Sequence, residues 1–300
     1  MSLIRASVGA TLLASLLALP DPASQAANPA LVLDARIVWS EPWKRFGGFS
    51  GFEVTDDGAR FVTVSDRAAW AEGDLVREDG RLTGAVSTSH GALHAISGET
   101  LQGYEIDAEG LALDADGRAY VSFEAFHRVR RYDRLDGPAS PVPSADAFVH
   151  LQNNSGLEAL AIDADGVLYT IPERSGAIDR PFRLHRFRDG AWDRKMRISR
   201  EGSFLPVGAD FGPDGRLYLL ERDFAWLGGF ATRIRRFRIE GNTAVADGTL
   251  LETAFGDLDN MEGIAVFLDP TGSTRITLIA DDNFLAFQRT VIAEYLLVGD

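Results

Sequence analysis

The sequence predicts an all-β protein, a β-propeller with five blades favoured, and three observations support this prediction. A pattern of strand, turn and strand recurs about every fifty residues along the chain. Most copies turn at Asp-Gly, where the glycine can adopt a positive φ. No long stretch has the 3.6-residue periodicity of a helix. Repeats of this length, each with about four short strands, are typical of propeller blades.

An acidic residue opens each copy of the repeat, and a glycine turn follows a few residues later. Successive leading acids are 56, 49, 52 and 52 residues apart. The strand after the turn alternates between two faces and is rich in β-formers, as in Arg118–Phe123. The leading acids are Glu53, Glu109, Glu158, Asp210 and Glu262.

The repeat accounts for the chain from Gly48 to Val298 as five units. A strand candidate at Leu31–Trp39 stands outside these units, and Thr290–Leu297 ends the last one. We expect these two terminal strands to pair in one blade and close the ring. Six blades are the alternative, with the extra blade in the glycine-rich stretch between Ala68 and Tyr104.

The composition excludes several classes of function. The 300 residues include 44 acids and 30 bases, which gives a formal net charge of −14. A chain this acidic, without a local basic patch, is a poor ligand for phosphate backbones, so we expect no nucleic-acid partner. The sequence has no cysteine. Disulfides, thiolate metal sites and a cysteine nucleophile are therefore excluded.

Residues 1–26 have the features of a secretory signal peptide. The apolar run Val8–Leu19 is too short to span a bilayer comfortably, and Ser24-Gln25-Ala26 offers a small-residue cleavage site. We therefore expect residues 27–300 to form one propeller domain, periplasmic or secreted, with no stable membrane anchor after cleavage. A weak N-terminal membrane anchor is the alternative.

We expect the leading acids to converge at one mouth of the central channel. Carboxylates at close range repel one another unless a cation neutralises them. Oxygen-only ligands favour Ca²⁺, with Mg²⁺ possible in principle. In the fourth copy Val207 replaces the glutamate, so either Asp210 supplies the acid or that position has none. The candidate metal ligands are Glu53, Glu109, Glu158, Asp210, Glu262 and Asp281.

A structural interpretation of these acids is equally consistent with the sequence. Each glutamate would then bond a backbone amide of the next blade as a repeated architectural device. Asp-x-Asp-Gly at 114–117 and 163–166 resembles the start of a calcium loop, but hairpin turn chemistry explains it. Asn153, Asn154 and Asn260 precede two of the glutamates and are candidate neutral oxygen ligands.

A second set of acids follows the second strand of each unit. In three copies an arginine comes directly after the acid, and these arginines form either blade-to-blade ion pairs or forks for an anionic substrate. The acids are Asp66, Glu124, Glu173, Glu221 and the pair Asp281–Asp282. The candidate substrate ligands are Arg67, Arg174, Arg222 and Asn283. A serine triad is unsupported, because the chain has no Gly-x-Ser-x-Gly elbow.

Several of these motifs resemble the bacterial phytase-like family described as having esterase-like activity of phytase. The resemblance spans nearly the whole chain after residue 26 and is most specific at Asp259–Gly263 and Asp281–Phe284. It implies an exported β-propeller that hydrolyses esters or phosphoesters. The other motifs that carry it are Phe49–Phe52, Glu109–Ala112, Leu157–Leu160 and Leu217–Arg222.

The sequence therefore leads us to expect a divalent-metal-dependent hydrolase of phosphoric or carboxylic esters. We expect a monomer that acts on a small anionic ester, with a carboxylate accepting the proton of an activated water. Two alternatives stay open: a sugar-lactone hydrolase, since the Glu-Gly strand starts also resemble gluconolactonase-type propellers, and a non-enzymatic binding or scaffold propeller. The expected catalytic residues are Glu109, Glu158, Glu262 and Asp282.

Overall fold

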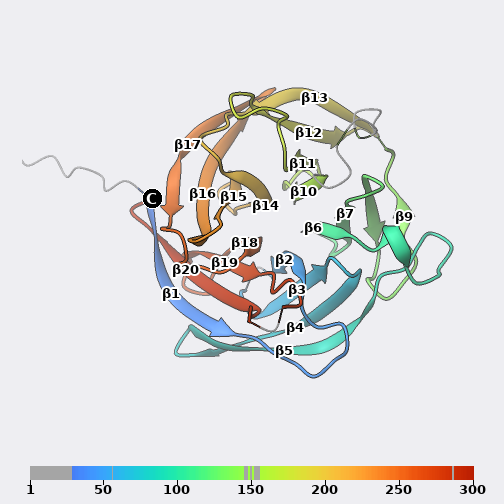
Figure 1. Ribbon diagram of the computed structural model, residues 1–300, viewed down its shortest axis with the longest axis horizontal. Helices are drawn as coiled ribbons and strands as arrows, with labels where there is room; N and C mark the ends of the chain where they lie inside the picture. The colour runs from blue at the N-terminus through green and yellow to red at the C-terminus, as the bar shows by residue number, and fades with distance from the viewer. Residues whose placement is uncertain (1–28, 56, 145–147, 149–150, 152–155, 286) are drawn as a thin grey trace, which may run out of the picture.

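Five four-stranded antiparallel sheets surround a central axis in the computed structural model (Figure 1). The structure describes residues 29–55, 57–144, 148, 151, 156–285 and 287–300. The expected signal peptide, and Asn153 and Asn154, lie outside these residues. Across the described ranges, no helix has the length and apolar character needed to cross a membrane.

The blades follow one another along the chain, each with its strands in order from the axis outward. The first blade contains β2 (Phe49–Val54), β3 (Arg60–Ser65), β4 (Ala69–Glu78) and β5 (Arg81–Ala92). The second contains β6 (Ala108–Leu113), β7 (Ala119–Phe123), β8 (Arg128–Tyr132) and β9 (Ser140–Pro141). The third contains β10 (Leu157–Ile162), β11 (Leu168–Pro172), β12 (Phe182–Arg188) and β13 (Ala191–Ile198). The fourth contains β14 (Leu205–Phe211), β15 (Leu217–Ala225), β16 (Gly229–Glu240) and β17 (Thr243–Glu252). A short 3₁₀ turn, Gly103–Glu105, precedes the second blade.

The fifth blade is built from both ends of the chain. It contains β18 (Met261–Leu268), β19 (Thr274–Ala280) and β20 (Val291–Val298), and β1 (Ala30–Val38) pairs antiparallel with β20 as its outermost strand. The predicted ring closure and the count of five blades are confirmed. The glycine-rich stretch supplies the outer strands β4 and β5 of the first blade rather than a sixth blade.

The innermost strands contact one another around the axis in the order β2, β6, β10, β14, β18 and back to β2. Each has a β-bulge near its start, and in four blades a glycine follows the bulged residue. A Cβ on Gly110 would lie 2.7 Å from the carbonyl oxygen of Glu158, and one on Gly208 would lie 2.5 Å from that of Glu262. Glycine therefore permits the close approach of neighbouring strands.

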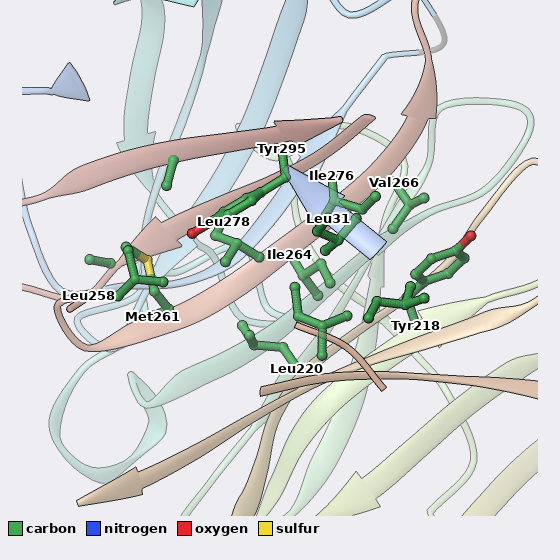
Figure 2. Packing of buried hydrophobic residues seen from close by; sticks show 14 of the residues in the cluster. Leu31, Tyr218, Leu220, Leu258, Met261, Ile264, Val266, Ile276, Leu278 and Tyr295 are labelled. Carbon is green, nitrogen blue, oxygen red and sulfur yellow. The ribbon is translucent and has the colours of Figure 1, made fainter. Parts of the chain in front are cut away.

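Apolar clusters between adjacent blades form the core. One cluster joins the fourth and fifth blades through Tyr218 and Leu220 of β15 and Ile264 of β18 (Figure 2). Leu31 of β1 and Tyr295 of β20 belong to the same cluster. The closing strand pair is thus held by apolar packing as well as by its backbone hydrogen bonds.

Glu294 forms a buried ionic link between the fifth and first blades. Its side chain has no exposed area, and both of its oxygens accept hydrogen bonds of 2.7 Å from the guanidinium of Arg77 in β4. Arg275 of β19 donates a further bond of 3.0 Å to it. A buried carboxylate is tolerated only when paired in this way.

Replacement of Glu294 by alanine will therefore destabilise the ring. Glu294→Ala leaves the Arg77 guanidinium without its carboxylate partner, while Arg275 keeps Asp34 and Asp269. We expect the free energy of unfolding to fall by about 3 kcal/mol. Urea unfolding followed by circular dichroism measures this. Glu240→Ala is the control, because the Glu240–Arg238 pair is half exposed and its loss costs less than about 1 kcal/mol. Equal unfolding midpoints for the two variants would contradict the argument.

Candidate functional site at the channel mouth

The bulge positions of the five innermost strands form one ring at the start of these strands, which we call the bulge ring. Glu109, Glu158 and Glu262 occupy it in the second, third and fifth blades. Ser50 and Val207 occupy it in the first and fourth blades. Of the two sequence alternatives for the fourth copy, the one without an acid at this position is therefore correct.

Glu53 and Asp210 form a second layer deeper along the strands. Glu53 was expected at the start of its strand but is the fifth of six residues in β2, and Asp210 is the matching residue of β14. The amide of Val266 donates to Asp210 at 2.7 Å, and the amide of Leu113 donates to Glu53. These two acids bond the next blade, as the structural interpretation predicts.

Burial dominates the protonation of this deeper pair. It raises the pKa of Glu53 well above its usual value, and repulsion by Asp210 adds to the shift. Burial also raises the pKa of Asp210 to about 7. Both shifts make these carboxyl groups harder to ionise than an exposed acid.

A second ring, which we call the strand-end ring, contains one residue from each blade. This residue lies where the second strand of the blade reaches the mouth. Backbone hydrogen bonds join each of its acids to the residue before the innermost strand. In the fourth blade Leu205 pairs with Arg222, so an arginine stands where the other blades have an acid. The strand-end ring is Asp66, Glu124, Glu173, Arg222 and Asp281.

The expected ring member Glu221 lies elsewhere. It is fully buried and accepts hydrogen bonds of 2.8 Å from Arg233 and 2.6 Å from Arg235 within its own sheet. Arg222 is at the mouth because it comes seven residues after the turn glycine, as Glu124 and Glu173 do in their blades.

Arg222 bridges the gap that Val207 leaves in the bulge ring. Its Nη1 donates to Asn260 Oδ1 at 2.5 Å and to Glu262, and its Nη2 lies 3.8 Å from Glu173 Oε1. Burial opposes the charge of Arg222, but the carboxylates of Glu262, Glu158 and Glu173 raise its pKa overall. Among the ten residues of the two rings, Arg222 is the one basic residue.

Arg67 and Arg174, two further candidate substrate ligands, are exposed at the rim. The guanidinium carbon of Arg67 stacks 3.2 Å from the ring centroid of Phe284, and Arg174 Nε lies 3.3 Å from Glu173 Oε2. Their sequence pattern is shared with Arg222, but their side chains occupy the edge of the site. The candidate substrate role of all three stays a prediction.

The loop after β19 is held together by its own acids. Asp282 accepts bonds from the amides of Gly48 and Phe284, both at 3.0 Å, and from the Thr290 hydroxyl at 3.1 Å. The amide of Asn283 donates to Asp281 at 2.7 Å. Asp282, an expected catalytic residue, therefore ties the fifth blade to the start of the first, and Asp281 is the member of the strand-end ring.

In the part of the chain that the structure describes, a cluster of three acids with the spacing of a metal site lies at the second blade. Asp107, Glu109 and Glu124 each offer an oxygen, and these atoms all lie within 4.8 Å of one another. Burial raises the pKa of all three, and repulsion by Glu158 and Glu262 adds to that of Glu109. Oxygen-only donors at this spacing fit Ca²⁺ or Mg²⁺.

Asp107 is the site residue that the sequence analysis missed. It comes directly before β6 and two residues before Glu109, and its carbonyl accepts a 2.8 Å bond from the amide of Glu124. The signal was present as two acids separated by one residue at a strand start. No other copy of the repeat has this pair, so a comparison of the copies does not identify Asp107 as part of the pattern.

The remaining strand-end acids add to the negative potential. Burial raises the pKa of Asp66 to about 7, with further repulsion from Asp107, Glu262 and Asp282. Burial and repulsion by Glu262 raise the pKa of Asp281 to about 8. Asn260 Nδ2 donates to Asp281 at 3.3 Å and to Glu262 at 2.9 Å. Acidic side chains therefore outnumber the arginines at the mouth, which are Arg222 within the rings and Arg67 and Arg174 at the rim.

These features define a five-bladed β-propeller with an acidic channel mouth. A model of the phytase-like family, described as "Esterase-like activity of phytase", matches residues 44–284. The chain belongs to this family. A search of curated proteins gives no match.

Solved structures share the propeller architecture at low identity. A PQQ-bound aldose sugar dehydrogenase from Streptomyces coelicolor is 13% identical with a TM-score of 0.50, over 90% of this chain and 99% of that one. A virginiamycin B lyase from Staphylococcus aureus is 12% identical with a TM-score of 0.45, over 90% of this chain and 100% of that one. The first likeness shows the fold alone, and the second is too distant for any argument.

The raised pKa values of Asp66 and Asp281 predict that the cation-free protein loses stability as the pH rises from 7 to 9. The folded state holds protons that the unfolded chain has already released, so deprotonation near pH 7–8 lowers the free energy of unfolding by about 1–2 kcal/mol. Urea unfolding in EDTA measures this, above the range in which histidines titrate.

Asp281→Asn should flatten this pH profile, because asparagine has no proton to lose. Asp116→Asn is the control, since the side chain of Asp116 is 71% exposed in a hairpin turn. Parallel profiles for the wild type and Asp281→Asn would show that Asp281 is already ionised at pH 7.

Proposed function

We propose that the channel mouth is the active site of a divalent-cation-dependent hydrolase of phosphoric or carboxylic esters. The observation that carries the proposal is the cluster of Asp107, Glu109 and Glu124, whose oxygens lie within 4.8 Å of one another. Membership of the phytase-like family supports the hydrolase class. The expected export of the chain belongs to this proposal, with a periplasmic or secreted enzyme acting on a small anionic ester.

The residues fit a bound divalent cation. Three half-buried carboxyl groups with raised pKa values gain a counter-charge when a cation replaces their protons. Asp107, Glu109 and Glu124 would hold it. When bound, Ca²⁺ or Mg²⁺ would supply Lewis acidity to the ester oxygen and lower the pKa of a water molecule.

Glu158 is the proton acceptor that the geometry favours. It belongs to the bulge ring beside Glu109 but lies outside the three-carboxylate cluster. Burial, followed by repulsion from Glu173 and Glu124, raises its pKa and makes its carboxylate a stronger base. Glu262 is less suited to this role, because Arg222 and Asn260 already donate to it.

Arg222 is the group positioned to hold an anionic substrate. It retains one guanidinium nitrogen 3.8 Å from Glu173, beyond hydrogen-bond distance, and its side chain is 22% exposed. A guanidinium can bind a phosphate or carboxylate with two parallel hydrogen bonds. Substrate would thus lie between Arg222 in the fourth blade and the carboxylate cluster in the second.

Removal of two cluster carboxylates should abolish the activity. For the double variant Glu109→Gln and Glu124→Gln we expect loss of Ca²⁺ binding in calorimetry and a fall of at least about 100-fold in kcat/KM. A panel of phosphate monoesters, phosphate diesters, carboxylic esters and lactones identifies the bond cleaved. Asp165→Asn is the matched control, since Asp165 is an exposed acid of an Asp-x-Asp-Gly turn.

The outcomes separate the three functions. Ca²⁺ binding and turnover that survive in the double variant would refute this site. Turnover of lactones alone would favour the lactone hydrolase. No heat of Ca²⁺ binding and no turnover by the wild type would favour a scaffold with purely structural acids.

A further inference from the structure

The fourth blade differs from the others at the mouth. It has Val207 in the bulge ring, where three of the other blades have an acid. It has Arg222 in the strand-end ring, where all four other blades have an acid. Its second strand, β15, has nine residues and is the longest of the five second strands. The hairpin β15–β16 therefore extends beyond Arg222 at the mouth end of the ring, with paired residues as far as Ala225 and Gly229.

Arg222 begins a stripe of aromatic side chains on one face of this hairpin. Arg222 and Phe224 are two residues apart in β15, so both point to the same side of the sheet. Phe230 of β16 is paired with Phe224, and their ring centroids are 5.0 Å apart. The guanidinium carbon of Arg222 lies 5.7 Å from the Phe230 ring. The apolar stripe is thus continuous with the arginine of the mouth.

The stripe continues to an exposed hairpin tip. Trp226 is 88% exposed and Leu227 is 97% exposed. Phe255, 45% exposed, lies beside the hairpin, since a Cβ on Gly228 would be 3.0 Å from its Cβ. Soluble proteins rarely leave contiguous apolar patches uncovered without a ligand. We name this surface the blade-four platform; it consists of Phe224, Trp226, Leu227, Phe230 and Phe255.

We propose that the blade-four platform binds the alkyl or aryl group of an anionic ester whose charged head group contacts Arg222, so that amphiphilic esters are the substrate class. This inference rests on the proposed hydrolase function. Arg222 is the one cation of the two rings, and the platform begins at it. From Arg222 to the end of β15 at Ala225 the strand rises roughly 10 Å, a length suited to a medium alkyl chain, and Trp226 follows directly.

The many carboxylates of the mouth argue against an anionic lipid surface as the occupant, because such a surface would face like charge over the whole mouth. A single amphiphile places its negative group at Arg222 alone. Its apolar group then covers aromatic side chains that would otherwise remain in water.

Two phosphonates test the platform without relying on catalysis. Octylphosphonate and ethylphosphonate have the same head group and no ester bond, and calorimetry below the micellar concentration gives the Kd of each. We expect the wild type to bind the octyl compound at least about tenfold more tightly. In the double variant W226S/L227S this ratio should fall below about threefold, with little change for ethylphosphonate. Arg222→Gln should weaken the binding of both.

Leu268→Ser is the matched control. Leu268 is also exposed, at 41%, but it ends β18 at the opposite end of the ring from the mouth. This variant should keep the wild-type ratio. Trp226→Phe should keep it too, because it preserves an apolar ring at the tip. Circular dichroism confirms that each variant is folded.

Equal Kd values for the two phosphonates, or an unchanged ratio in W226S/L227S, would overturn the proposal. If the Kd values are equal and the wild type binds phosphatidylcholine vesicles in a way that W226S/L227S removes, the surface is assigned to lipid. If the Kd values are equal and W226S/L227S removes self-association, the surface is assigned to a second copy of the chain. Ester turnover without chain-length preference would also overturn it and leave the hydrolase standing. An intact Kd ratio without any ester turnover would instead refute the hydrolase and keep the amphiphile site.

Discussion

The close approach of five innermost strands around one axis is the constraint on which the rest of the structure depends. Adjacent strands meet so tightly at the bulge that four blades have glycine there, with Leu111, Phe52 or a neighbouring carbonyl within 2.7 Å of where a Cβ would stand. The bulge turns the bulged residue of each innermost strand toward the channel mouth. Backbone packing therefore places Glu109, Glu158 and Glu262 together in spite of their mutual repulsion.

The two layers of acids meet this repulsion in different ways. Glu53 and Asp210 accept main-chain hydrogen bonds from the next blade, and burial raises the pKa of both. At the mouth the fourth blade contributes a positive charge instead, since Arg222 lies between the carboxylates of the third and fifth blades. The second blade has no such arginine among its ring residues. Unbalanced charge is therefore concentrated on the side of the ring opposite to the apolar hairpin.

The repeat predicted the blades and their closure because hairpin spacing and strand alternation are local properties of the chain. It predicted the site less completely, because the copies were matched by their acids and not by distance from the turn. The turn glycine comes eight residues after the bulge position in four blades, at Ser50, Glu109, Glu158 and Val207. Matching the nearest acid instead placed Glu53 beside Glu109 and chose Glu221 in place of Arg222. Asp107 was missed because it belongs to one blade only. The exposed tip at Trp226 was not foreseen either, because the hairpin extension appears only once strand lengths are compared.

Proton exchange links the mouth chemistry to its electrostatics. The oxygens of Asp107, Glu109 and Glu124 lie within 4.8 Å of one another, and burial raises the pKa of all three. A cation that replaces protons on these groups gains direct Coulomb attraction in a partly buried setting, where attraction is less screened than in water. Affinity for the cation must then rise with pH as the raised pKa values are passed. The same burial that makes these carboxyl groups hard to ionise alone is thus what makes them suited to hold a divalent ion.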